Sequence, residues 1–106
     1  MWEVNGNDIK MAEEDFGVRL PMTVHGTTLS AGDEIAFVLK NRMNGNTILT
    51  KTFSSIQDNT FNLVFTEEES ELLKVGTYVY RLDWYQDGMF RCNIIPSAVF
   101  KVGDKA

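Results

Sequence analysis

The stretch 66–88, TEEESELLKVGTYVYRLDWYQDG, changes at Gly76 from an acidic run into an alternation rich in aromatic residues. Thr66 and Glu69 fit a capping box, in which the threonine hydroxyl accepts from the backbone near Glu69 and the glutamate side chain bonds back. Gly76 can supply the left-handed residue that ends a helix. The stretch therefore predicts a short helix, with both of its leucines facing the core, followed directly by a strand.

The residues after Gly76 alternate with a period of two, which indicates a strand with one buried face. The following Asp87-Gly88 is a hairpin signal, because both residues tolerate the backbone angles of a tight turn. One face of the strand carries Tyr78, Tyr80, Leu82 and Trp84, and the opposite face carries Val79, Arg81, Asp83 and Tyr85.

An earlier strand contains a proline. In DFGVRLPMTV, residues 15–24, the apolar face is made by Val18, Leu20, Met22 and Val24. Proline cannot donate a hydrogen bond to a neighbouring strand, so Pro21 predicts that this strand lies at the edge of a sheet or carries an irregularity there. His25-Gly26 after it is an expected turn.

Further runs in the chain also have strand character. Residues 33–41 are followed by Asn44-Gly45, which predicts a type I′ hairpin to a return strand at 47–55. The facing of that return strand stays open, because Ile48 and Leu49 are neighbours. The inward residues expected from the other runs are Ile35, Phe37 and Leu39, then Phe61, Leu63 and Phe65, and finally Ala98, Phe100 and Val102.

The fold class follows from these strands together. About seven short strands with regular turn signals are typical of an antiparallel sandwich. Tyr78 matches the tyrosine that starts the penultimate strand of immunoglobulin-like domains, whose hydroxyl bonds back to the preceding corner. Tyr80 stands where antibody domains keep their second cysteine. We predict an all-β, immunoglobulin-like antiparallel β-sandwich of about seven strands, with one short helix before the penultimate strand.

The length of 106 residues suits one domain with one modest core. We expect a single domain over residues 1–106, with the core in 8–102 and a polar tail at 103–106. The start, MWEVNGNDIK, lacks the basic and apolar segments of a secretory signal. We therefore expect either a protein made and kept inside the cell, which is the simpler case, or a processed fragment.

The charge and the hydropathy pattern exclude two kinds of partner. A net charge of −5 with scattered basic residues argues against nucleic-acid binding, which needs clustered Lys and Arg. No run approaches the roughly 18 apolar residues of a membrane span. We therefore expect neither nucleic acid nor a membrane as a partner.

Reactive side chains are few in this sequence. His25 is the only histidine and Cys92 the only cysteine, and such a pair cannot make the ligand set that zinc needs. We interpret His25 as a solvated turn residue and Cys92 as a small, buried strand residue. The glutamates at 67–69 and 71 suit the start of a helix better than acid–base work. We expect no catalytic residue, no metal site, no cofactor and no enzyme activity.

Two aromatic residues are left unexplained by the predicted core, Trp2 and Tyr85. A cluster of exposed aromatic residues marks an interface, whereas a single one is common on monomers. Trp2 and Tyr85 are therefore the candidate contacts with a partner, and Tyr78 is a structural residue.

The order of these features carries a resemblance to a known family. It consists of an opening strand that ends in an acidic pair (DIKMAEEDF), alternating strands with a polar hairpin, a short acidic helix, L-x-x-G-T-Y-x-Y and a closing F-x-V strand. This order resembles the N-terminal Ig-like domain of the phage baseplate upper protein family, from tail and receptor-binding assemblies of phages and prophages of Gram-positive bacteria. The resemblance extends from Ile9 to Val102 and is most specific over residues 67–80. Members often have Gly-Asp where this chain has Glu14-Asp15, and they usually continue into further domains.

The resemblance implies a structural role without enzyme activity or cofactor. The chain would then be an assembly module of a phage or prophage tail, baseplate or fibre, docking to neighbouring tail subunits, with self-association as a further option. It would be located in the virion after synthesis in the bacterial cytoplasm. The alternative is an Ig-like binding module of a bacterial protein, which recognises glycan or protein through exposed aromatic residues.

Overall fold

The computed structural model describes residues 3–12, 17, 19–26, 28–30, 32–54, 56 and 58–103. The elements, in chain order, are β1 (Glu3–Asn5), β2 (Asp8–Ala12), β3 (Leu20–Thr23), β4 (Asp33–Asn41), β5 (Thr47–Phe53), β6 (Thr60–Leu63), α1 (Glu67–Ser70), β7 (Gly76–Gln86) and β8 (Met89–Gly103).

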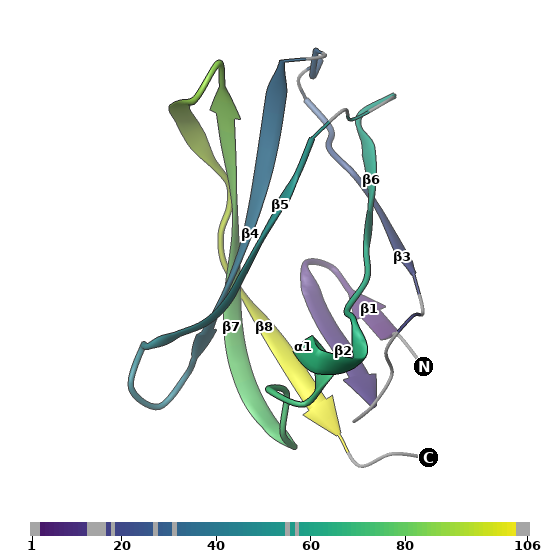
Figure 1. Ribbon diagram of the computed structural model, residues 1–106, viewed down its shortest axis with the longest axis vertical. Helices are drawn as coiled ribbons and strands as arrows, with labels where there is room; N and C mark the ends of the chain where they lie inside the picture. The colour runs from purple at the N-terminus through teal and green to yellow at the C-terminus, as the bar shows by residue number, and fades with distance from the viewer. Residues whose placement is uncertain are drawn as a thin grey trace.

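The strands form two sheets that face each other (Figure 1). The larger sheet has the order β1-β2-β8-β7-β4-β5, and the smaller one consists of β3 and β6. The last strand, β8, lies between the early strand β2 and the penultimate strand β7, as in immunoglobulin-like domains. The predicted all-β, immunoglobulin-like sandwich, with a short helix before the penultimate strand, is confirmed.

One detail of the sheets differs from the prediction. Strand β2 runs parallel to β8, with Ile9 opposite Phe100, so the sandwich is not antiparallel throughout. The described residues contain eight strands, close to the predicted number of about seven, and β1 and β2 form a hairpin of their own. Gly6, in the turn of the β1–β2 hairpin, has a φ of 62°. Asn5-Gly6 is the same kind of hairpin signal as Asn44-Gly45.

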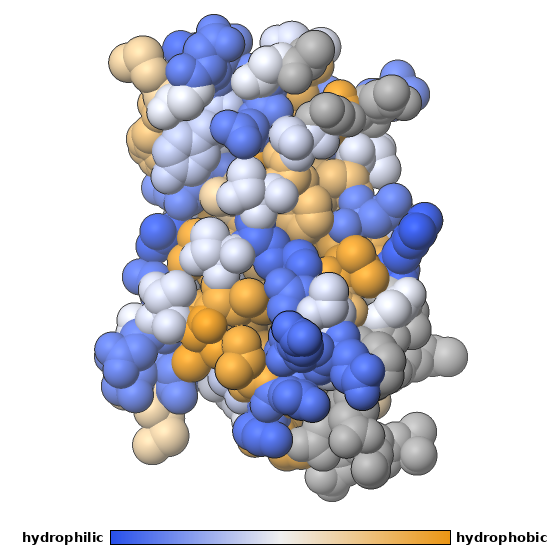
Figure 2. All heavy atoms as spheres, viewed as in Figure 1, coloured by the Kyte–Doolittle hydropathy of each residue, from blue (hydrophilic) through white to orange (hydrophobic). Residues whose placement is uncertain are grey.

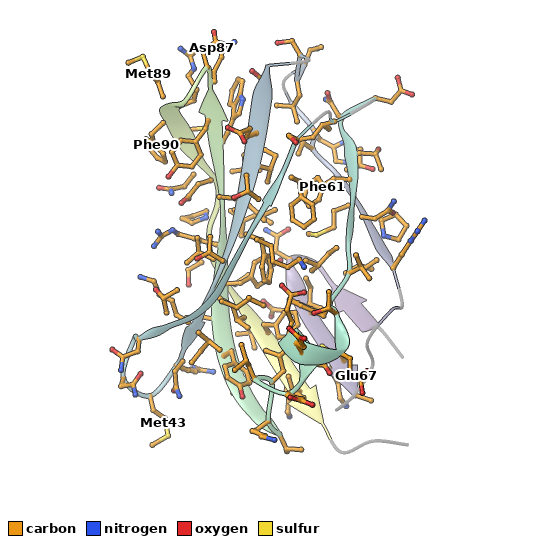
Figure 3. All side chains as sticks on the ribbon, viewed as in Figure 1. Met43, Phe61, Glu67, Asp87, Met89 and Phe90 are labelled. Carbon is orange, nitrogen blue, oxygen red and sulfur yellow. The ribbon has the colours of Figure 1, made fainter. Side chains whose placement is uncertain are left out.

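Aromatic rings meet at the centre of the core. Phe37 on β4 stacks on Tyr80 of β7, with ring centroids 5.2 Å apart. Its other contacts are edge-on, with Phe65 at 6.1 Å and Phe100 at 6.0 Å. Phe61 of β6 points into the space between the sheets (Figure 3). The inward residues predicted for β4, for 60–65 and for the end of β8 are all buried, which confirms those three predictions.

Strand β3 is paired on one side only. Among the described strands its partner is β6, with Pro21 opposite Asn62. The backbone N–H of Val24 donates to the carbonyl of Asn59 at 2.8 Å, so the N–H groups at 20, 22 and 24 point toward β6 and the nitrogen of Pro21 points away from it. The predicted edge position of Pro21 is confirmed. Leu20, Met22 and Val24 turn inward as expected, and Val18 lies outside the described residues.

The turns of the β7–β8 and β4–β5 hairpins differ. Asp87 and Gly88 both have positive φ, of 52° and 80°, which fits the predicted tight turn. Asn44-Gly45 does join β4 to β5, but only Gly45 has a positive φ. The loop closes instead through Asn41, whose carbonyl accepts from the N–H of Gly45 at 2.8 Å and whose N–H donates to Asn46 at 2.8 Å. The type I′ prediction was wrong at this position because the loop contains four residues rather than two.

The helix is a single capped turn. Thr66 and Glu69 form both halves of the predicted capping box, and α1 ends at Ser70. Leu73 is buried, but Leu72 is 52% exposed, so only one of the two leucines faces the core. Gly76 is the first residue of β7 rather than the helix stop, since the helix is too short to extend that far.

Strand β5 is held to the helix by an ion pair. The register places Leu49, Lys51 and Phe53 on the inward face, opposite Leu39, Phe37 and Ile35, which settles the facing that the sequence left open. Lys51 Nζ donates to Glu69 Oε1 at 2.6 Å and lies 5.7 Å from the ring centroid of Phe65. An inward-pointing charge on an edge strand protects that edge against pairing with another chain.

We expect Tyr78→Phe to lower the free energy of unfolding by about 1 kcal/mol. The Tyr78 hydroxyl donates to the carbonyl of Lys74 at 2.7 Å, which is the corner hydrogen bond that the sequence predicted. Urea unfolding measures the loss, with Tyr85→Phe on the outer face as the matched control. Equal effects of the two substitutions would show that the corner bond contributes nothing specific.

The ion pair predicts a loss of stability in acid. Partial burial alone raises the pKa of Glu69, but the hydrogen bonds from Lys51 and Thr66 outweigh it, and the pKa lies below its ordinary value of 4.5. A carboxylate whose pKa is lower in the folded than in the unfolded state stabilises the fold at pH values above its unfolded-state pKa. This stabilisation is lost as the pH falls through the folded-state pKa. The stability advantage of wild type over Glu69→Gln should therefore shrink in urea unfolding below pH 4.5.

The control for this experiment is Glu68→Gln, an exposed change in the same helix. It should leave the free energy of unfolding within about 0.5 kcal/mol of wild type at each pH. An advantage over Glu69→Gln that persists unchanged into strong acid contradicts the role of the Glu69 carboxylate.

Candidate functional site

The tip of the β7–β8 hairpin exposes large apolar side chains. Met89 is 72% exposed and Phe90 is 53% exposed, directly after the Asp87-Gly88 turn. Together with Tyr85 they form what we call the hairpin-tip patch. Figure 3 shows Met89 and Phe90 at the outer end of the hairpin, and Figure 2 shows hydrophobic colouring at the same corner of the molecule. This patch is the first candidate binding surface.

The patch is held by its two aromatic rings. Tyr85 lies opposite Phe90 in the pairing of β7 with β8, and their ring centroids are 5.7 Å apart at an angle of 74°. On its other side Tyr85 lies opposite Glu34 of β4. Since Trp84 packs against the core, alternation along the strand places Tyr85 on the outer face of the larger sheet.

Polar contacts stiffen the strand beneath the patch. Asp83 is buried, and its carboxylate accepts from Arg81 Nε at 2.9 Å and from Asn93 Nδ2 at 2.5 Å. Arg91 lies 5.5 Å from the ring of Trp84. The turn packs closely as well, because a Cβ at Gly32 would lie 3.0 Å from Asp87 Oδ1. The hairpin therefore presents its apolar residues on a firmly held stem.

The sequence-predicted contact residues are only partly placed by the structure. Tyr85 belongs to the patch, whereas Trp2 lies outside the described residues. Met89 and Phe90 were missed, although two large apolar residues directly after a turn could have been noticed. His25 is exposed, as expected of a turn residue. Cys92 lies in a strand but is exposed, so the prediction of a buried cysteine was wrong.

A second candidate site is a cavity of about 420 Å³ between the two sheets. It lies between residues 20–25, which include β3, and residues 94–95 of β8. Its floor is the core itself, with Tyr80 and Leu82 from β7 and Phe61 from β6. The remaining described lining residues come from three segments, namely Gly6, Asn7 and Ile9, then residues 20–25, and finally Ile94 and Ile95.

Tyr80 anchors the floor of this cavity. Its hydroxyl donates to the backbone carbonyl of Asn7 in the β1–β2 turn, so one hydrogen bond joins the first hairpin to the penultimate strand. Burial, with a smaller contribution from the negative charge of Asp8, raises the pKa of Tyr80 to about 12. The phenol therefore stays neutral at ordinary pH, and its donor is already engaged.

Ligand groups for a metal do not converge in the described part of the chain. There, no three His, Cys, Asp or Glu side chains are placed so that they could hold a metal ion. Over the same residues, no helix has the length and apolar character needed to cross a membrane.

Comparisons of the chain with protein-family models, with curated proteins and with solved structures found no match. The hairpin-tip patch and the cavity must therefore be interpreted from their own chemistry.

The raised pKa of Tyr80 predicts a loss of stability in alkali. A phenol whose pKa is higher in the folded than in the unfolded state contributes its full stabilisation at pH values below the unfolded-state pKa, here 10.0. This contribution is lost as the pH rises toward the folded-state pKa of about 12. Urea unfolding from pH 9 to 12 should show a steeper fall for wild type than for Tyr80→Phe. At pH 7 the same substitution should cost about 1 kcal/mol, because the Asn7 carbonyl loses its donor.

Tyr85→Phe, which removes a tyrosine from the outer face, should keep the alkaline fall of wild type. If Tyr80→Phe and Tyr85→Phe give the same pH profile, the buried phenol is not the group responsible.

Proposed function

We propose that this chain is a non-enzymatic assembly module that docks onto neighbouring protein subunits through the hairpin-tip patch. One observation carries the proposal, namely that a stiff hairpin holds Met89 and Phe90 in solvent instead of in the core. Exposed apolar groups next to polar ones are the usual composition of a protein-binding surface, with Phe, Tyr and Met enriched at its centre.

The charges around the patch indicate the character of the partner. Glu34 lies opposite Tyr85, Asp87 forms the turn, and Arg91 follows Phe90. The chain as a whole carries a net charge of −5. Complementary potentials speed association and exclude wrong partners. We therefore infer a partner with an apolar recess whose rim is mainly basic.

The biological setting that we propose is a phage or prophage tail. The order of strands, acidic helix and L-x-x-G-T-Y-x-Y supports it through the resemblance to the baseplate upper protein family. In that setting the chain is made in the bacterial cytoplasm and becomes part of the tail, baseplate or fibre in the virion. Its partners are other tail subunits, and self-association is an option within the same role.

The alternative, recognition of a glycan, draws on the aromatic rings beside carboxylates. A sugar stacks on a flat, open ring face. The ring planes of Tyr85 and Phe90 meet at 74°, and part of the surface of each ring is in contact with the other ring. This geometry favours insertion of Phe90 into a protein recess. A glycan array with wild type and with Tyr85→Ala separates the alternatives, because specific glycan binding that depends on Tyr85 would contradict the assembly role.

We expect the double variant Met89→Ser, Phe90→Ser to lose at least tenfold in affinity for its partner and to keep the stability of wild type. The reason is that exposed side chains contribute little to folding, whereas the central apolar residues of an interface dominate binding. The measurement is co-expression and biolayer interferometry with the products of the genes that flank this one.

The matched control is Met43→Ser, a change at the still more exposed tip of the β4–β5 loop. It should bind as wild type does, since Met43 lies at the other end of the molecule in Figure 3. Undiminished binding by the double variant contradicts docking through this patch. A gene neighbourhood of surface-protein genes, without tail, baseplate or lysis genes, contradicts the phage setting.

A further inference from the structure

We propose that the cavity between β3 and β8 is a binding site for a small, uncharged and mainly apolar molecule. This inference is independent of the proposed docking function, because the cavity shares no residue with the hairpin-tip patch. It depends on four features of the cavity, which are its size, its lining, its polar groups and its edges.

The size of the cavity suits a ligand of about three aromatic rings. Its volume of about 420 Å³ falls within the range of roughly 300–1,000 Å³ typical of ligand pockets. It is almost three times an engineered cavity of about 150 Å³ that takes up one benzene molecule.

The lining selects against charge. The floor is formed by fully or nearly fully buried apolar residues, including Ile9, Leu82 and Phe61, and the walls by the half-buried Leu20, Met22 and Ile94. None of the described residues that line the cavity is Asp, Glu, Lys or Arg. An ionised ligand would lose its hydration without meeting an opposite charge. Neutral molecules are therefore the class that fits.

The polar groups of the cavity are largely engaged. The Tyr80 hydroxyl donates to the Asn7 carbonyl, and Thr23 Oγ1 shares a hydrogen bond with Thr60 Oγ1 at 3.1 Å. His25 is exposed at the rim. A ligand with one neutral polar end, directed at the rim, would satisfy this arrangement.

The strand edges around the mouth decide between a small molecule and an added peptide strand. Six consecutive residues, 20–25, line the cavity, so β3 presents its edge to it. The nitrogen of Pro21 points to this free edge and has no hydrogen to donate. In the neighbouring β2–β8 pair Asp8 Oδ1 accepts from the N–H of Val99 at 3.0 Å, and Pro96 lies at a shift in the β7–β8 register. These features oppose pairing with an incoming strand, which needs a continuous row of free backbone groups.

The test uses two probes that differ by one charge. N-phenyl-1-naphthylamine is neutral and apolar, and 8-anilinonaphthalene-1-sulfonate has the same aromatic skeleton with a sulfonate. Fluorescence titration of wild type should give saturable one-to-one binding, with affinity for the neutral probe at least tenfold higher. Amide shifts in ¹H–¹⁵N spectra should concentrate in β3, in residues 94–95 and in the β1–β2 turn.

Variants that fill the cavity sharpen the test. Met22→Trp and Ile94→Trp add a large side chain from opposite walls and should each weaken the neutral probe at least tenfold. Met43→Trp, at an exposed loop tip, should bind as wild type does. Near-ultraviolet circular dichroism shows which variants are folded. If neither variant with a filled cavity folds, the location of the amide shifts in the wild-type protein decides whether the neutral probe binds in the cavity.

Three results would overturn the proposal. The first is sulfonate binding as tight as that of the neutral probe. The second is unchanged neutral-probe affinity in a folded, filled variant, or amide shifts that concentrate at the hairpin-tip patch. The third is an alternating apolar peptide that protects the amides of β3 or β8 from exchange and displaces the neutral probe, which would assign the site to a strand.

Discussion

The contacts of the Phe37 ring connect most of this molecule. Phe37 lies on β4, stacks on Tyr80 of β7 and meets the edges of Phe100 of β8 and Phe65 beyond β6. Phe65 also meets Phe100 at 5.9 Å, and Lys51 lies over its ring. Loss of a buried aromatic ring costs about 3–5 kcal/mol, which is a large part of the roughly 5–15 kcal/mol that stabilises a domain. One cluster of rings thus joins three strands of the larger sheet to Phe65, in the segment between β6 and the helix.

Among the described residues the smaller sheet contains only β3 and β6, and this has consequences for the surface. Two strands cannot cover the face of a six-stranded sheet, so the sandwich is open along its sides. Figure 2 shows hydrophobic atoms along the seam between β5 and β6. Two of the strand edges carry a feature that opposes pairing, namely Lys51 on β5 and Pro21 on β3. The open sides therefore admit side chains or ligands more readily than strands.

Local patterns in the sequence were sufficient for the core and the cap. Phe37, Phe61 and Phe100 follow from alternation alone, and the Thr66–Glu69 capping box follows from two residues. Cys92 was misplaced because its prediction rested on the usual burial of free cysteine, which says nothing of where a strand lies. Cys92 is opposite Trp84 near the tip of the β7–β8 hairpin, and it is exposed there.

The candidate sites were harder to find from the sequence than the core. Tyr85 was recognised as an aromatic residue without a core position. Met89 and Phe90 were missed, because alternation does not show which residues of a hairpin lie exposed next to its turn. The cavity was not predictable at all. It requires β3 to lie opposite residues 94–95 across the sandwich, and this depends on the absence of a further strand beside β3 among the described residues.

Strand β7 contributes to both surfaces and keeps them independent. Tyr80 and Leu82 face the cavity, and Tyr85 faces outward three residues further along. Coupling between two sites needs an element with two discrete arrangements. Strand β7 is paired on both sides and is further held by the hydrogen bonds of Asp83, so it provides no such element. A ligand in the cavity would then stabilise the fold by mass action and leave docking at the hairpin tip unchanged.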